Sequence, residues 1–169
     1  MSIDRKAENM LNITYFYFGQ QKDSYFRSAM DEYIKRIGKY AKFTEKVLKP
    51  ENLPDNPTQN EINQCLEKES KQLLPYLTKS ALKIAMCVEG KTMSSEDFAK
   101  TFQNAMINGK SEIIFVVGSS YGLSQSVKKE CDVRLSFSPM TFAHGLFGVM
   151  LTEQIYRAMT ILNGEKYHK

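Results

Sequence analysis

The last residues of this chain carry side chains that are unusual for a terminus. The segment NGEKYHK ends an apolar run at Gly164 and then places an aromatic ring, an imidazole and a cation together at Tyr167, His168 and Lys169. His168 is one of only two histidines among the 169 residues. Chain ends are usually frayed, whereas an imidazole titrates near neutral pH, so these side chains are candidates for chemistry.

A second candidate is the loop VVGSSYGLS, which follows a purely apolar run and holds Gly118 and Gly122 four residues apart. The pattern is not the dinucleotide fingerprint G-x-G-x-x-G, and it lacks the Lys-Ser/Thr pair of a P-loop. Two interpretations stay open. The glycines can form a simple tight turn, or they can let a neutral or zwitterionic cofactor approach main-chain N–H and C=O groups closely.

The third candidate is the loop FSPMTFAHG, which alternates small polar and large apolar side chains. Such a loop can hold an aromatic base between apolar side chains while its backbone supplies hydrogen bonds. Its aromatic residues can equally well cap the core. The residues concerned are Phe137, Ser138, Pro139, Met140, Thr141 and Phe142.

The cysteines and the net charge exclude some classes of site. Cys65, Cys87 and Cys131 are far apart and odd in number, which matches neither a disulfide framework nor a zinc site. With two histidines in the chain, we expect no dedicated metal centre. The formal net charge of +4 permits a phosphate-rich partner but does not require one.

Strand-type and helix-type patterns alternate along the chain. We expect strands at 12–18, 43–48, 82–88, 112–117 and near 133–138, and helices at 23–37, from the Thr58–Glu61 capping box to Pro75, at 94–106, from about 124, and at about 145–162. This alternation predicts an α/β fold with a parallel sheet of five or six strands and helices on both faces. In such sheets ligands bind at the carboxyl ends of the strands, where the candidate loops fall.

One domain is expected over residues 11–169, after a loose extension over residues 1–10. No run has the length and apolar purity of a membrane span, so no membrane partner is expected. The first ten residues lack the apolar region of a secretory signal, which predicts a cytoplasmic protein.

The expected terminal helix is apolar over a wide arc. Only Glu153, Arg157 and Thr160 form a clearly polar stripe. A helix in the outer layer of a sheet normally needs one apolar stripe. Two apolar sides predict that the helix is covered by its own sheet and by a second copy of the chain, which makes a homodimer; deep burial within one chain is the alternative.

These motifs carry a family resemblance. The stretch from Gly118 to Lys169 resembles the bacterial SPOUT-class methyltransferases that modify N3 of a pseudouridine in large-subunit (23S) ribosomal RNA. The pattern L-S-x-S-x-M-T-F-x-H, followed by E-Q-x-Y-R-A and a terminal Y-H-K, is long and specific. The likeness begins at YFYFG and continues through VEGKTMSSEDFA to the last residue.

The resemblance implies a fold and a cofactor. The C-terminal segment would thread through a loop to form a trefoil knot, and the homodimer would pack through the terminal helix. S-adenosylmethionine would lie in the knot against Met86, Gly118 and residues 137–142. A sulfonium methyl group is already activated, so the transfer needs alignment and no metal.

The resemblance also implies a role for the tail. Tyr167 would stack on or orient the target base. A further hypothesis rests on the chemistry of the imidazole alone: His168 would assist loss of the N3 proton as a catalytic base. Lys166, Lys169 and Arg157 would contact the RNA, the two lysines through phosphate. The substrate would be ribosomal RNA, recognised on assembled ribosomes.

Three positions depart from the family pattern. Ser119 stands where most members carry a second glycine, Ala143 where they carry proline, and Gly148 where they carry an arginine that should lie near cofactor or RNA. These departures leave two alternatives beside the ribosomal enzyme: a divergent SPOUT protein acting on another RNA, and a catalytically weak RNA-binding or assembly factor. A flavodoxin-like nucleotide binder fits the coarse fold but not the motifs.

Overall fold

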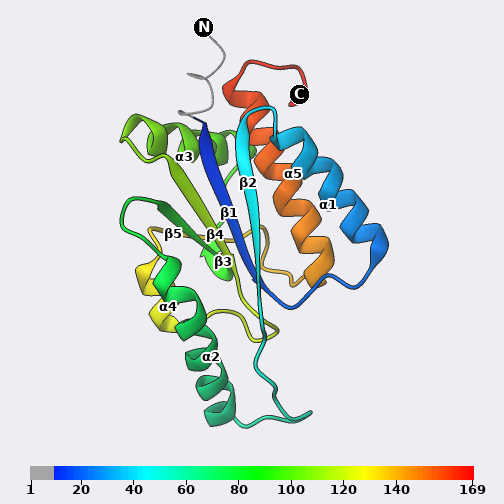
Figure 1. The fold of residues 1–169 in the computed structure, drawn as a ribbon, viewed down its shortest axis with the longest axis vertical. Helices are drawn as coiled ribbons and strands as arrows, with labels where there is room; N and C mark the ends of the chain where they lie inside the picture. The colour runs from blue at the N-terminus through cyan, green and yellow to red at the C-terminus, as the bar shows by residue number, and fades with distance from the viewer. Residues whose placement is uncertain (1–9) are drawn as a thin grey trace, which may run out of the picture.

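Five strands and five α-helices alternate along residues 10–169, the part of the chain that this computed structural model describes (Figure 1). The strands are β1 (Leu11–Phe18), β2 (Ala41–Leu48), β3 (Leu82–Lys91), β4 (Glu112–Val117) and β5 (Val133–Leu135). The helices are α1 (Ser24–Ile37), α2 (Gln59–Leu73), α3 (Ser95–Ile107), α4 (Gln125–Glu130) and α5 (His144–Leu162), and the 3₁₀ helix η2 (Leu74–Tyr76) follows α2.

The strands form one sheet in the order β2-β1-β4-β3-β5, and each neighbouring pair is parallel. The central strand β4 reads EIIFVV and is buried along nearly its whole length. This burial follows from its position, because a central parallel strand is covered on both faces. The predicted parallel α/β fold is therefore confirmed, with five strands.

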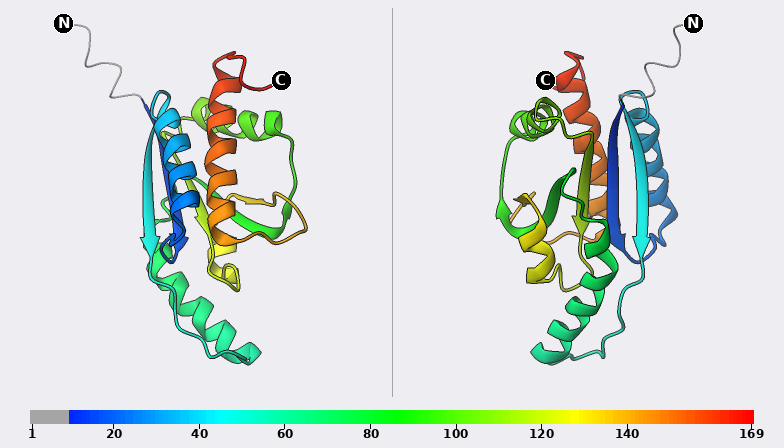
Figure 2. Two further views of the ribbon diagram at one scale, coloured as in Figure 1. Left: turned by 90° about the vertical axis from the view of Figure 1, so that its right-hand side faces the viewer. Right: turned by 60° about the vertical axis from the view of Figure 1, so that its left-hand side comes forward.

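Helices cover both faces of this sheet (Figure 2). Alternate residues of β1 and β4 belong to two separate apolar clusters, since successive side chains of a strand point to opposite faces. One cluster joins the sheet to α1, α3 and α5 through residues such as Met30, Phe102 and Leu151. The other joins it to α2, η2 and α4 through Leu73 and Val127.

Local signals set most element boundaries. The Thr58–Glu61 capping box opens α2 as expected, with both of its reciprocal hydrogen bonds formed. Helix α2 ends at Leu73, and Pro75 lies in the 3₁₀ turn that follows, so the helix fails where proline predicts.

Several strand boundaries differ from the expectation. β1 begins at Leu11 rather than at residue 12, and β2 begins at Ala41 rather than at residue 43. β5 stops at Leu135 rather than near residue 138, and β3 continues past Gly90 to Lys91. Met86 and Lys91 both pair with Leu135, so residues 87–90 bulge away from β5. Glycine at position 90 permits this arrangement, because a Cβ there would lie 2.6 Å from the carbonyl carbon of Leu135.

The predicted trefoil knot stays a prediction. The structure shows that the chain leaving β5 crosses β3 closely, with Ser136 N donating a hydrogen bond to Lys91 O at 3.0 Å. The predicted extension over residues 1–10 falls almost entirely on residues 1–9, which lie outside the described residues.

Candidate active site

A cavity of about 750 Å³ lies at the carboxyl ends of the strands. Its wall is formed by segments that leave all five strands: residues 18–21, Pro50, residues 86–89, 117–122 and 135–142. The start of α5 closes one side with His144 and Phe147. The volume falls in the range of small-molecule sites, and the location is the one expected for a parallel α/β sheet.

The two loops singled out from the sequence meet at this cavity, together with Met86 of β3. Of the residues predicted to contact the cofactor, Met86, Gly118, Phe137, Ser138, Met140, Thr141 and Phe142 line it. Pro139 does not line it. The sheet brings these distant segments together. Strands β3, β4 and β5 end at the same edge of the sheet, so residues 86, 118 and 137–142 lie close to one another there.

The glycine loop after β4 is tightly built. A Cβ at Gly118 would lie 2.1 Å from the carbonyl oxygen of Gly122, and Gly122 has φ +83°. Ser119 Oγ donates a 2.7 Å hydrogen bond to Glu69, a buried carboxylate that also accepts from the backbone N–H of Glu51 at 3.0 Å. In this chain the serine therefore fixes the loop to α2, so the departure from a second glycine has a structural partner.

The loop after β5 is braced by its own polar groups. Ser136 Oγ donates to Ser138 O at 2.9 Å, and Met140 N donates to Ser138 Oγ at 3.0 Å. The rings of Phe137 and Phe147 stack with centroids 5.1 Å apart. Phe137 packs on the core, as one interpretation of this loop expects, and it also lines the cavity. The interpretation that the loop holds an aromatic base stays a prediction.

Several wall residues were missed by sequence reasoning. Gln21 and Pro50 follow β1 and β2, and the rule that ligands bind beyond the carboxyl ends of strands could have found them. His144 belongs to the quoted loop motif but was not assigned to the cavity. Glu89 and Lys128 also line the cavity and contact each other across 39 positions of sequence, which no local pattern signals.

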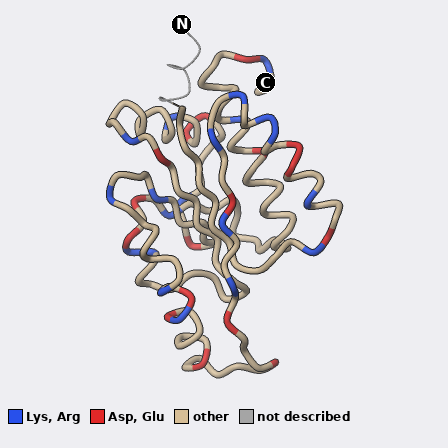
Figure 3. The backbone as a smooth tube through the Cα atoms, viewed as in Figure 1, with Lys and Arg blue, Asp and Glu red and all other residues tan. Residues whose placement is uncertain are grey.

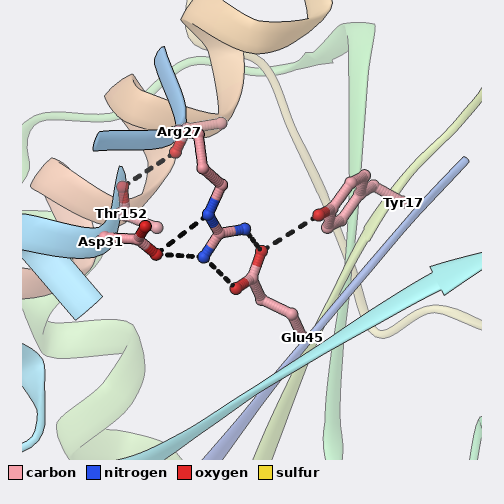
Figure 4. A network of polar contacts seen from close by, with 6 residues as sticks. Tyr17, Arg27, Asp31, Glu45 and Thr152 are labelled. Carbon is pink, nitrogen blue, oxygen red and sulfur yellow. Dashed lines mark hydrogen bonds and ion pairs between the residues drawn. The ribbon is translucent and has the colours of Figure 1, made fainter. Parts of the chain in front are cut away.

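A polar network holds β1, β2 and α1 together beside the cavity (Figure 4). Arg27 donates to Glu45 at 2.8 Å and pairs with Asp31, and Tyr17 donates to Glu45 at 3.0 Å. Burial and the adjacent Glu45 carboxylate raise the pKa of Tyr17 to about 12, so it stays a neutral donor. Its ring lies 6.1 Å from that of His144, and partial burial lowers the pKa of His144.

Gly148 faces the core and not the cavity. A Cβ at this position would lie 2.7 Å from Met30 Sδ and 3.6 Å from the Tyr15 hydroxyl oxygen, both between α5 and its neighbours. Thr152 donates a 2.9 Å hydrogen bond to Gly148 O on the same helix. In this chain the space beside position 148 is filled by Met30 and Tyr15. A place for the family arginine near cofactor or RNA stays a prediction.

The C-terminal tail is held in place, away from the cavity of its own chain. Tyr167 donates to Glu153 at 2.9 Å, and its ring lies under the guanidinium of Arg157 at 4.7 Å. His168 contacts Glu96 at 3.0 Å and Arg157 at 3.3 Å. At 1.5 Å of rise per residue, these α5 positions lie roughly 14 to 20 Å along the helix from its first residue, which lines the cavity.

The tail begins with a second anchor. Glu165 accepts hydrogen bonds from Lys39 Nζ and from the Tyr40 hydroxyl, each at 2.7 Å. Lys166 and Lys169 are exposed. None of residues 165–169 lines the cavity, so a role of Tyr167 and His168 in catalysis stays a prediction that requires another chain.

Residues 10–169 contain no group of three His, Cys, Asp or Glu side chains that could hold a metal ion. No helix in this range is both long and apolar enough to cross a bilayer.

The sheet order, the cavity at its carboxyl edge and the close-packed glycine loop define an α/β enzyme site for a small molecule. The family described as "Predicted SPOUT methyltransferase" matches residues 11–168, and the chain belongs to that family. The predicted methyltransferase class and its donor, S-adenosylmethionine, are thereby confirmed.

Relatives match over their whole length. Ribosomal RNA large subunit methyltransferase H of Clostridium perfringens (strain ATCC 13124) is 45% identical, over 94% of this chain and 100% of its own. The protein of the same name from Clostridium botulinum (strain Loch Maree) is 43% identical with the same coverage.

Solved structures show the same fold at low identity. A methyltransferase structure from Bordetella pertussis Tohama I matches with a TM-score of 0.56 and 12% identity, covering 90% of this chain and 98% of that one. A methylase-family structure from Haemophilus influenzae Rd KW20 matches with a TM-score of 0.52 and 13% identity, covering 94% and 70%.

Proposed function

We propose that this chain transfers a methyl group from S-adenosylmethionine to N3 of a pseudouridine in 23S ribosomal RNA, on assembled ribosomes in the cytoplasm. The observation that carries the proposal is the meeting of three distant segments, at 86–89, 117–122 and 135–142, around one cavity. The names of relatives that match over their full length support large-subunit ribosomal RNA as the substrate.

The cavity suits the proposed donor. Aromatic and aliphatic side chains such as Phe142 and Met86 offer surfaces for an adenine ring, and Gly118 lines the cavity with backbone alone. When bound, S-adenosylmethionine supplies an activated methyl group. The contribution of the protein is to orient the donor, to exclude water and to take a proton from the target nitrogen.

The charge distribution favours a preassembled substrate. Basic and acidic residues are interspersed over the helices and along β2 in the view of Figure 3, in keeping with a net charge of +4. A protein with such a mild charge gains limited affinity from phosphate contacts alone. An assembled ribosome holds the target base in a fixed shape, and recognition of that shape compensates for the limited affinity from phosphate contacts.

We further propose a homodimer in which the tail of one chain completes the cavity of the other. The buried side of α5 holds Leu151 and Ile155, whereas Leu146 is 39% exposed and Val149 and Met150 are partly exposed on its other side. Val149 and Met150 line a second cavity of about 400 Å³ between α5 and α3. A partner chain that covers this side would bury the second apolar face of α5.

Methyl transfer from labelled S-adenosylmethionine tests the enzyme. Ribosomes that lack the modification and isolated 23S RNA serve as two substrates, and the position of the label is read by nuclease digestion. We expect label on pseudouridine in ribosomes. Cofactor binding without transfer would instead support the assembly-factor alternative, and label in another RNA would support a divergent specificity.

Mixed dimers test the role of the tail. One protomer lacks residues 167–169 and the other carries Gly118→Ala, so each homodimer is inactive. If the tail acts in trans, the mixed dimer regains one complete site, with the intact cavity of the first protomer and the intact tail of the second. An inactive mixed dimer that still binds the donor would contradict this arrangement.

A further inference from the structure

The cavity wall contains one ion pair. Among the described residues that line the cavity, Glu89 is the only acidic side chain and Lys128 the only basic one other than histidine. His144 also lines it, and partial burial lowers the pKa of His144, which favours its neutral form near pH 7. The formal charge of the wall is therefore concentrated at one place.

Backbone geometry presents this pair to the cavity. Glu89 lies in the segment of β3 that bulges away from β5, and Lys128 projects from α4 behind the glycine loop. The Lys128 side chain is 10% exposed and contacts Glu89, whose side chain is 55% exposed. The carboxylate thus remains open toward the cavity while the ammonium is held beneath it.

Burying a lysine in the cavity wall costs free energy. Desolvation of an ion pair often cancels its Coulombic gain, and an apolar residue of similar volume would fill position 128 at lower cost. The Lys128 ammonium donates a hydrogen bond to the Glu89 carboxylate, and this hydrogen bond lowers the pKa of Glu89. A charge kept inside a cavity in this way is expected to meet a charge on the ligand.

The proposed donor carries such charges at its amino-acid end. Its α-ammonium group requires a hydrogen-bond acceptor, which the Glu89 carboxylate provides. Its α-carboxylate requires hydrogen-bond donors, which the Lys128 ammonium provides. We propose that Glu89 and Lys128 bind the α-amino and α-carboxylate groups of the donor's methionine moiety and so determine preference for donors with an intact amino-acid end. This inference rests on the proposed use of S-adenosylmethionine.

Calorimetric titration with two probes tests the pair without requiring turnover. S-adenosylhomocysteine keeps the amino-acid end, whereas 5′-methylthioadenosine lacks it. We expect Glu89→Gln and Lys128→Met each to weaken binding of the first probe roughly 10- to 100-fold, the size of one charge-assisted hydrogen bond, and to leave the second within twofold. Lys129→Met, on the exposed neighbour in α4, is the matched control.

The double variant Glu89→Gln/Lys128→Met controls for misfolding of the single variants, because it leaves no unpaired charge buried. Its thermal unfolding is measured together with its affinities for both probes. Equal losses for both probes would place the pair on the adenosine part or in cavity shape, and unchanged affinities would remove it from the site; either result overturns the inference. A wild-type protein that binds neither probe contradicts the donor itself. A wild-type protein that binds both equally contradicts only this pair.

Discussion

Replacing Gly148 by alanine adds one methyl group at the contact between α5 and α1, and its effect on stability separates two accounts of this position. Alanine improves helix propensity by about 1 kcal/mol over glycine in a helix interior. Against this, the new Cβ would lie 2.7 Å from Met30 Sδ, and Met30 is only 2% exposed. Overpacking of a filled core costs about 1–3 kcal/mol, so the net expectation is a loss of about 0–2 kcal/mol.

Urea unfolding measures this difference through the transition midpoint at constant m-value. The cycle of Gly148→Ala, Met30→Ala and the double variant tests the contact directly, because the methyl group should be tolerated better once the methionine is shortened. Gly109→Ala is a useful comparison: nothing lies within 4 Å of its Cβ position and its φ is +76°, so it reports backbone strain alone. A full gain of about 1 kcal/mol for Gly148→Ala, with no coupling to Met30, would refute the packing account.

Restoring the family arginine extends the same reasoning to activity. Gly148→Arg must place a guanidinium group against Met30 and the Tyr15 ring, which is 1% exposed, and an unpaired buried charge is strongly destabilising. We expect a protein that unfolds at much lower urea concentration and transfers no faster. A folded variant with faster methyl transfer would show that the arginine belongs to the chemistry and that position 148 reaches the ligand.

Three further changes have defined outcomes. Gly118→Ala forces a Cβ to 2.1 Å from Gly122 O, a backbone atom that cannot turn aside, so we expect at least a tenfold loss of S-adenosylhomocysteine affinity by calorimetry; unchanged affinity would contradict the cavity assignment. Thr58→Ala removes the cap that accepts from Glu61 N and should lower urea stability by about 1 kcal/mol with transfer unaffected. Burial lowers the pKa of His144 below its value in the unfolded chain, about 6.5. The contribution of His144 to the free energy of unfolding is therefore complete above pH 6.5 and is lost as the pH falls. His144→Gln should make the urea midpoint depend less on pH between about pH 7.5 and 5, and an unchanged pH dependence would contradict this.

The sequence predicted those parts of the site that depend on strand ends. The run EIIFVV is apolar on both faces, which identified β4 as a central strand, and the rule for parallel sheets then placed the loops at 118–122 and 137–142 at one edge. Gly90 was interpreted as the end of β3, because glycine commonly stops a strand. The pairing of β3 with β5 overrides that local signal and continues the strand to Lys91.

Long-range contacts account for what could not be predicted. Glu89 and Lys128 are 39 positions apart, and Glu165 lies 126 positions from Lys39, so neither contact leaves a periodic trace in the sequence. The chemistry of the tail was visible from its residue types. Its anchoring beside Glu153 depends on the direction in which α5 leaves the cavity, which only the packed fold determines.

The length of α5 bears on the role of the proposed dimer in the mechanism. The helix begins at the cavity with His144 and holds His168 through Arg157, roughly 20 Å further along its axis at 1.5 Å per residue. A base must come within hydrogen-bond distance of the proton that it removes, so His168 cannot serve the cavity of its own chain in this arrangement. Proton removal by the tail therefore requires a second chain. Transfer that persists at dilutions where the protein is monomeric would instead require a base in the cavity wall of the same chain. His144 lies in that wall, and its lowered pKa keeps the imidazole neutral near pH 7.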